Sequence, residues 1–239
     1  MNFRMREREM KPVCLFVAIV ACMLITSITT SAVADDLTPP PWRDFAHPYY
    51  TLSAWDFVTP ANPTPPDGHG PPLPPIVGDG GPPPVVPSAT MGATMAYDAG
   101  IGGWFPIGTA GGDIHLYIPN WIDFEPLKLI RVQMTYFGDP GASPDIVLVS
   151  GGDNVVGPVV GAPLGPPSIL VLDPFDTHFH WFQDWAITPN PDWEFIDIFV
   201  PRDTVIDQIV VDTISLPEPT TLGLLGLAAL AVIRRSRHD

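Results

Sequence analysis

The sequence predicts an all-β ectodomain, a jelly-roll-like antiparallel β-sandwich, between an N-terminal signal peptide and a short C-terminal transmembrane helix. From Met91 onward, short apolar or alternating segments recur, and clusters of Gly, Pro and Asn separate them. No amphipathic helical stretch of any length occurs in this region. Seven or eight such strands with loops at both ends favour two packed sheets, and an edge-free barrel is the alternative.

Residues 1–34 are predicted to be a secretory signal peptide. Basic residues at the start precede a thirteen-residue apolar core at 13–25, and Ala32-Val33-Ala34 supplies the small residues of a cleavage site. Thirteen apolar residues are too few to favour a permanent membrane span. We therefore expect cleavage after Ala34, with Ala32 and Ala34 as the recognised pair, and an uncleaved anchor is the alternative.

Both cysteines of the chain, Cys14 and Cys22, lie inside the predicted signal peptide. The mature protein then contains no cysteine. An exported domain of this size has to fold by burying a real apolar core, because disulfides are not available to it. Thiolate metal sites and cysteine nucleophiles are excluded for the same reason.

The charge of the region between the two targeting segments is strongly negative. From Asp35 to Ser215 there are four basic residues and twenty-two acidic ones, which gives a formal charge of −18. Binding to nucleic acid requires positive charge to release counterions from phosphates, so nucleic acid is not expected as a partner. Cations or neutral glycans fit better, and the alternative is that acidity only keeps an exported protein soluble.

Residues 35–87 are predicted to be an extended, proline-rich N-terminal region with one strand. Twelve of the twenty-eight residues from Pro60 to Pro87 are proline, so neither a helix nor a strand ladder can run through them. Residues 55–58 precede this loop and form the one predicted strand, near 50–58, which can join the main body. The alternative is a wholly extended arm without a partner.

Residues 88–215 are predicted to form the β-sandwich domain. The longer strands should turn one clean apolar face toward the core, such as Ile130, Val132, Met134 and Tyr136, or Phe179, Trp181 and Trp185. The predicted strands are 113–119, 127–137, 145–149, 168–172, 177–187, 193–200 and 204–215.

His178 and His180 share one face of a predicted strand with Asp184, because side chains two residues apart point the same way. Two imidazoles on one face could bind a metal. However, His115 is the only other histidine of the strand-rich region, and no acidic residue stands at a recognisable spacing to complete a set of three ligands. The alternative is a solvated polar face opposite a tryptophan core.

Calcium is the better metal candidate, since oxygen ligands are abundant. Asp79, Asp98 and Asp153 lie in glycine-containing loops, although none of these loops has the spacing of an EF-hand or of a calcium-binding repeat. No cofactor is expected other than such a structural calcium ion.

Tryptophans could stack on sugar rings of an extracellular polysaccharide. Most should be core residues, but Trp104 follows Gly102-Gly103 and Trp121 follows Pro119-Asn120, so both are expected on loops as candidate glycan contacts. No nucleophile elbow, phosphate loop or dinucleotide fingerprint is present, so the chain is not expected to be an enzyme and no catalytic residue is assigned.

The last twenty-four residues, 216–239, have three parts in a fixed order. Pro217, Glu218 and Pro219 come first, an apolar run from Leu222 to Ile233 follows, and Arg234, Arg235 and Arg237 stand near the end. Arginines resist translocation and stop a segment in the bilayer. The twelve residues of the run span roughly 18 Å as a helix against the ~30 Å of a hydrocarbon core, which predicts a weak, temporary anchor. An ordinary retained membrane helix and a buried globular helix are the alternatives.

This tail resembles the PEP-CTERM sorting signal of exported bacterial proteins. The resemblance implies that an exosortase, a membrane-embedded protease, recognises Pro217-Glu218-Pro219 and removes the tail. It implies transient anchoring in the inner membrane of a bacterium with an outer envelope, and then a place at the cell surface or in the extracellular matrix. The resemblance covers about a tenth of the chain and gives no activity for the ectodomain.

The sequence therefore favours an exported structural or adhesive module, or a weak glycan-binding one. The alternative is an extracellular polysaccharide-modifying enzyme that uses two acidic residues across a sugar.

Overall fold

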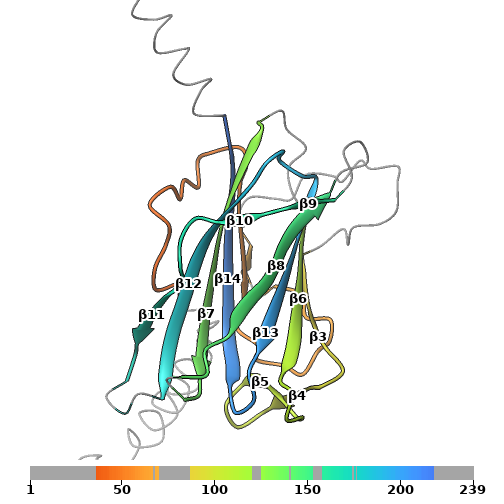
Figure 1. Ribbon diagram of the computed structural model, residues 1–239, viewed down its shortest axis with the longest axis vertical. Helices are drawn as coiled ribbons and strands as arrows, with labels where there is room; N and C mark the ends of the chain where they lie inside the picture. The colour runs from red at the N-terminus through yellow and green to blue at the C-terminus, as the bar shows by residue number, and fades with distance from the viewer. Residues whose placement is uncertain are drawn as a thin grey trace, which may run out of the picture. The chain divides into compact units, whose positions relative to one another are not determined.

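The computed structural model describes residues 36–66, 68–69, 87–119, 125–139, 141–152, 158–173, 175 and 177–217, all within one compact unit. These residues form two antiparallel sheets and no helix, which confirms the all-β prediction in a β-sandwich-like form (Figure 1). The predicted signal peptide and the apolar run 222–233 lie outside the described residues. Within the described part, no helix is long and apolar enough to cross a membrane.

The larger sheet has β14 (Val205–Leu216) near its middle, between β7 (Leu127–Phe137) and β1 (Tyr50–Trp55). On the far side of β7 lies β12 (His178–Ile187), whose outer edge carries two short strands, β10 (Ala162–Pro163) and β11 (Ser168–Val171). The remaining members are β2 (Gly68–His69), next to β1, and the pair β4 (Met95–Asp98) and β5 (Gly103–Pro106), which joins the sheet through β14.

The smaller sheet has the order β3-β6-β13-β8-β9. Its central strand β13 alternates strictly between buried and less buried positions, and Ile196, Ile198 and Val200 are each fully buried. This period of two is the signature of a sheet with one face on the core. The bounds are β3 (Ser88–Met91), β6 (Gly112–Pro119), β8 (Asp145–Gly152), β9 (Val159–Val160) and β13 (Trp193–Val200).

One continuous core lies between the two sheets and takes side chains from both. The predicted apolar faces of β7 and β12 point into it, with Trp181 fully buried and Phe179 almost so. Burial of each large apolar side chain contributes about 1.5–3 kcal/mol, which explains how a domain without cysteines can fold.

β1 occupies residues 50–55, earlier than the predicted segment 55–58. The extended conformation ends before Phe57, whose φ of 41° is left-handed. β1 pairs with β14 in register from Tyr50 opposite Ile214 to Trp55 opposite Ile209, so the alternative of an arm without a partner is wrong.

β14, like its neighbour β7, is buried on both faces over most of its length, in β14 from Ile209 to Ser215. Ile209 and Val211 belong to the core between the sheets. Asp212, fully buried, lies on the opposite face, where residues 36–49 cross the sheet. We call residues 36–49 the strap.

Candidate functional site

Two regions of the larger sheet carry the features that bear on function, namely the end of β14 and the polar face under the strap. β14 runs to Leu216, and Pro217, the first residue of the Pro-Glu-Pro motif, follows it directly. Glu218, Pro219 and the three arginines of the tail lie outside the described residues. The fold therefore leads into the tail without an intervening loop.

A buried polar cluster anchors the C-terminal end of β14, just before the tail. Ser215 is fully buried, and its hydroxyl accepts hydrogen bonds from the Lys128 ammonium at 3.1 Å and from the Asn190 side chain at 3.2 Å. The same ammonium lies 3.6 Å from a carboxylate oxygen of Glu194, and both charged side chains are fully buried. Since Lys128 is on β7 and Glu194 is on β13, the pair joins the two sheets beside the point where the chain leaves them.

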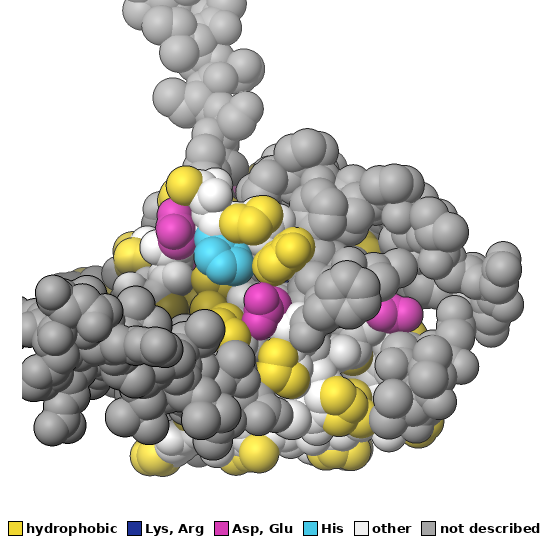
Figure 2. All heavy atoms as spheres, turned by 90° about the horizontal axis from the view of Figure 1, so that it is seen from above, with side chains coloured by type: hydrophobic (Ala, Val, Ile, Leu, Met, Phe, Trp, Pro, Cys, Tyr) yellow, Lys and Arg dark blue, Asp and Glu magenta, His cyan; other side chains and the backbone are white. Residues whose placement is uncertain are grey.

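The described side chains seen around this exit are not basic. Seen from the end of the sandwich at which β14 leaves, the visible described side chains include acidic and apolar ones, and none of them is Lys or Arg (Figure 2). This agrees with the excess of acidic residues over basic ones in the sequence.

The polar face is formed by charged residues that lie opposite one another on adjacent strands. Asp212 on β14 stands opposite Arg131 on β7, and Arg131 stands opposite Asp184 on β12, so three charged residues form one row across three strands. The Arg131 guanidinium donates two hydrogen bonds to Asp184, of 2.7 and 2.6 Å. A planar guanidinium and a carboxylate match in this two-pronged way, which fixes their orientation.

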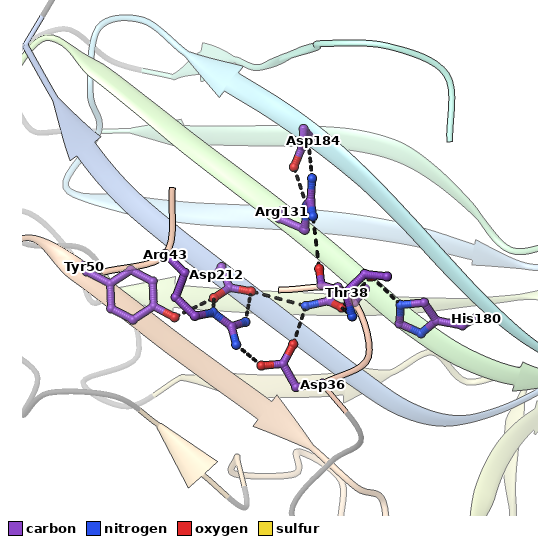
Figure 3. Close-up of polar contacts among 9 residues, drawn as sticks. Asp36, Thr38, Arg43, Tyr50, Arg131, His180, Asp184 and Asp212 are labelled. Carbon is purple, nitrogen blue, oxygen red and sulfur yellow. Dashed lines mark hydrogen bonds and ion pairs between the residues drawn. The ribbon is translucent and has the colours of Figure 1, made fainter. Parts of the chain in front are cut away.

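The strap supplies the partner of Asp212 (Figure 3). Arg43 donates two hydrogen bonds to the Asp212 carboxylate, of 2.7 and 2.6 Å, and it also forms an ion pair with Asp36. Tyr50 donates its hydroxyl hydrogen to Asp212. Burial, together with the neighbouring Asp212 charge, raises the pKa of Tyr50 far above its usual range, so the phenol stays protonated as a donor.

Thr38 fixes the other end of the strap. Its backbone oxygen accepts a hydrogen bond from Arg131 at 3.0 Å, and its hydroxyl donates to the side-chain oxygen of Gln133 at 2.9 Å. The same hydroxyl lies 2.7 Å from Nε2 of His180. A hydroxyl has only one hydrogen to donate, so the His180 Nε2–H is the donor in this contact.

His180 is fully buried, and burial, then the nearby charge of Arg131, lowers the pKa of His180 to about 4. It is neutral at ordinary pH. The alternative of a solvated polar face on this strand is therefore wrong at His180. The strap covers that face, and sequence periodicity could not show this because it reports only that two faces differ.

The two candidate metal-binding histidines are engaged separately. His178 stacks on Phe137 with ring centroids 4.1 Å apart and lies 3.8 Å from Asp207, whereas His180 contacts Thr38. In the part of the chain that the structure describes, no three His, Cys, Asp or Glu side chains converge as metal ligands would.

Of the candidate calcium ligands, Asp79 and Asp153 lie outside the described residues. Asp98 is described, and its carboxylate caps a tight turn by accepting hydrogen bonds from the backbone amides of Gly100 at 2.7 Å and Ile101 at 3.3 Å. An aspartate that bonds the backbone two residues later is a common turn element.

Trp104 does not lie on an exposed loop, so the prediction made for it is wrong. It belongs to β5, its side chain is 6% exposed, and it packs against Tyr97. The reason is the preceding Gly103, where a Cβ would stand 2.6 Å from the backbone oxygen of Ile206. That glycine lets β5 approach β14 closely, so that Trp104 pairs with Ile206 in the sheet instead of lying on a loop. Trp121, the second candidate glycan contact, lies outside the described residues.

The strap network was missed from the sequence. The available signal was the scarcity of basic residues: two of the four in the ectodomain, Arg43 and Arg131, are in the network. In a chain with so many carboxylates, each arginine is expected to select particular partners, but which carboxylate it selects depends on strand register.

Comparison with known proteins addresses the tail alone. The family described as the PEP-CTERM protein-sorting motif matches residues 215–237, a span that begins inside β14. The chain matches no curated protein and no solved structure. The motif implies export, a membrane-anchored sorting signal and processing by an exosortase. Residues 215–237 are thus a PEP-CTERM protein-sorting motif, as the tail's three parts predicted, and the chain is consistent with an exosortase substrate.

Proposed function

We propose that this protein is a non-enzymatic structural or adhesive module that an exosortase delivers to the bacterial cell surface or its extracellular polymer. The observation that carries the proposal is the direct passage of β14 into the sorting motif. The six residue-to-residue steps from Leu216 to Leu222 span at most about 22 Å when extended. The sandwich is then held close to the membrane until the tail is cut.

The strand order supports a jelly-roll-like sandwich for this module. In the larger sheet β1, β14, β7 and β12 are neighbours in that order, and in the smaller sheet β6, β13, β8 and β9 are. Consecutive strands of the chain therefore alternate between the sheets at several points, as double-sheet jelly rolls require.

The roles of the acidic residues also support a structural function. Asp184 and Asp212 are bound by arginines, and Glu194 is fully buried opposite Lys128. A glycosidase needs two carboxylates exposed to the same sugar, one on each side of the scissile bond. These three carboxylates instead join strands to each other or to the strap. Attachment to polysaccharide, with Trp121 as a contact, and a structural calcium ion remain parts of the proposal.

The test is made in the native host with the full-length precursor. Changing Pro217, Glu218 and Pro219 to alanine removes the rigid, non-helical recognition peptide, so the protein should stay in the membrane fraction at full length. The control changes Thr220 and Thr221 to alanine, which leaves the motif intact and should permit processing. Release of the first variant like wild type would contradict the sorting part of the proposal.

The molecular role is tested separately. The processed wild-type protein, screened on a glycan array with and without calcium, should bind extracellular polysaccharide weakly and leave it uncut. Release of shortened or modified glycan would favour the enzyme alternative instead.

A further inference from the structure

β11 is an edge strand that lacks the usual protection of sheet edges. It pairs with β12 on one side only, and among the described residues nothing pairs with its other side (Figure 1). Every residue of β11 is exposed, and the segment Ser168–Leu172 contains neither a charged residue nor a proline. Charged residues, prolines and bulges are the devices by which edge strands avoid pairing with other chains.

The backbone groups that are free to pair can be assigned from the register. The amide of Leu172 donates to the carbonyl of His178, so this opposed pair is a hydrogen-bonded one. Hydrogen-bonded and non-hydrogen-bonded pairs alternate along an antiparallel ladder. Leu170, opposite His180, therefore also faces β12, whereas the N–H and C=O groups of Ile169 and Val171 point outward.

The side chains of this edge are apolar. Ile169 is 43% exposed and Val171 is 55% exposed, and the neighbouring Leu164 and Phe175 are more exposed still. The mature chain has a formal charge of −18, so two copies repel each other over most of their surface. The charge-free edge is where that repulsion is weakest and where apolar area can be removed from water.

We propose that β11 is a self-association edge, at which two copies of this chain pair β11 with β11 antiparallel and extend the larger sheet from one molecule into the next. The register that pairs all the outward groups of Ile169 and Val171 with one another is the one in which Ile169 of each copy forms a hydrogen-bonded pair with Val171 of the other. The twofold axis then passes between the two copies of Leu170. The inference does not depend on the proposed surface role, since it concerns only the sandwich.

This contact is small. A standard interface uses about 20–30 residues on each side, whereas this edge offers one short strand and a few neighbours. We therefore expect a weak, concentration-dependent dimer, suited to a protein that is crowded at a surface or in a matrix.

Cysteine cross-linking gives a direct test, because the processed chain contains no other cysteine if the signal peptide is cut as predicted. In the proposed register the two copies of Leu170 form a non-hydrogen-bonded pair with Cα atoms about 4.5 Å apart, within the range a disulfide spans. Leu170→Cys should form a disulfide-linked dimer under mild oxidation. The control Ile169→Cys places its two cysteines diagonally, about 7–8 Å apart, and should cross-link much less.

A second variant tests the edge without disturbing the fold. Ile169→Pro removes an outward N–H and leaves the pairing of β11 with β12 intact, since proline is tolerated on the solvent side of an edge strand. In sedimentation velocity the processed wild-type protein should approach twice its monomer mass as its concentration rises. The proline variant should stay monomeric with a melting temperature close to that of wild type.

Three results would overturn the inference. They are a wild-type protein that stays monomeric at the highest soluble concentration, equal cross-linking of Leu170→Cys and Ile169→Cys, and a dimer that persists in Ile169→Pro. The last result would place the contact on another surface.

Discussion

Removing the Arg43 guanidinium should weaken the attachment of the strap and destabilise the sandwich. In Arg43→Ala, the Asp212 carboxylate stays fully buried and loses its charged partner, while Tyr50 and Gln133 still donate to it. Breaking a buried ion pair from one side costs about 3–5 kcal/mol, and the two remaining donors argue for the low end, about 3 kcal/mol. For a chain of this size that lowers the melting temperature by roughly 6–12 °C.

The measurement is thermal or urea unfolding of the processed protein, with hydrogen exchange of residues 36–49 to follow the strap itself. Arg202→Ala is the matched control, because the Arg202 side chain is 60% exposed and its ion pair with Asp203 is a surface one, worth about 0–1 kcal/mol. Arg43→Ala with Asp212→Ala should cost less than the sum of the single changes, since the unpaired charge is gone. If Arg43→Ala and Arg202→Ala had equal effects, the strap would not be held as described.

Three further outcomes are expected. The folded state disfavours protonation of His180, whose pKa is about 4 against 6.5 in the unfolded chain, so the unfolded state binds more protons in this window. The free energy of unfolding should therefore fall by up to about 3 kcal/mol from pH 6.5 to pH 4, and His180→Gln should flatten this slope in pH-dependent urea titrations, whereas His115→Gln should not. If the acidic loops bind calcium, millimolar free calcium should raise the melting temperature by mass action, and an unchanged melting temperature would remove the structural ion from the proposal. Neutral residues at Arg234, Arg235 and Arg237 should weaken the membrane stop and give unprocessed protein outside the membrane in cell fractionation, and normal processing would show that the arginines are not needed.

The sequence predicted the interior of the sandwich well because the period of side-chain burial in a strand is a local property. The apolar face of β7, from Ile130 to Tyr136, and that of β13, from Ile196 to Val200, are buried as expected. The sorting motif of the tail was predicted equally well, since its Pro-Glu-Pro, apolar and basic parts are contiguous in the sequence.

The features that were missed depend on contacts between distant residues. Arg43 meets Asp212, 169 positions later, and Thr38 meets His180, 142 positions later. Alternation in 177–187 identified His180 as lying on the polar face but could not show that a proline-containing segment would cover it. Trp104 was predicted to lie on a loop because two glycines precede it. Gly103 in fact allows the backbones of two strands to approach each other closely.

The place of β14 also determines how the protein responds to a pull on its C-terminal end. Both neighbours are antiparallel to β14, with Leu127 of β7 and Tyr50 of β1 beside its C-terminal end. A force on Pro217 that is opposed at the far end of the sandwich shears the ladder hydrogen bonds together, which is the stiff direction. A force opposed through Tyr50 opens the β1 ladder from that end, one bond after another. The strap changes this second case, because a pull on the N-terminus first has to break the contacts of Arg43 with Asp212, inside the ladder. The charged contacts of the strap thus resist this bond-by-bond opening of the β1–β14 ladder, which is the direction in which a tethered molecule is weakest.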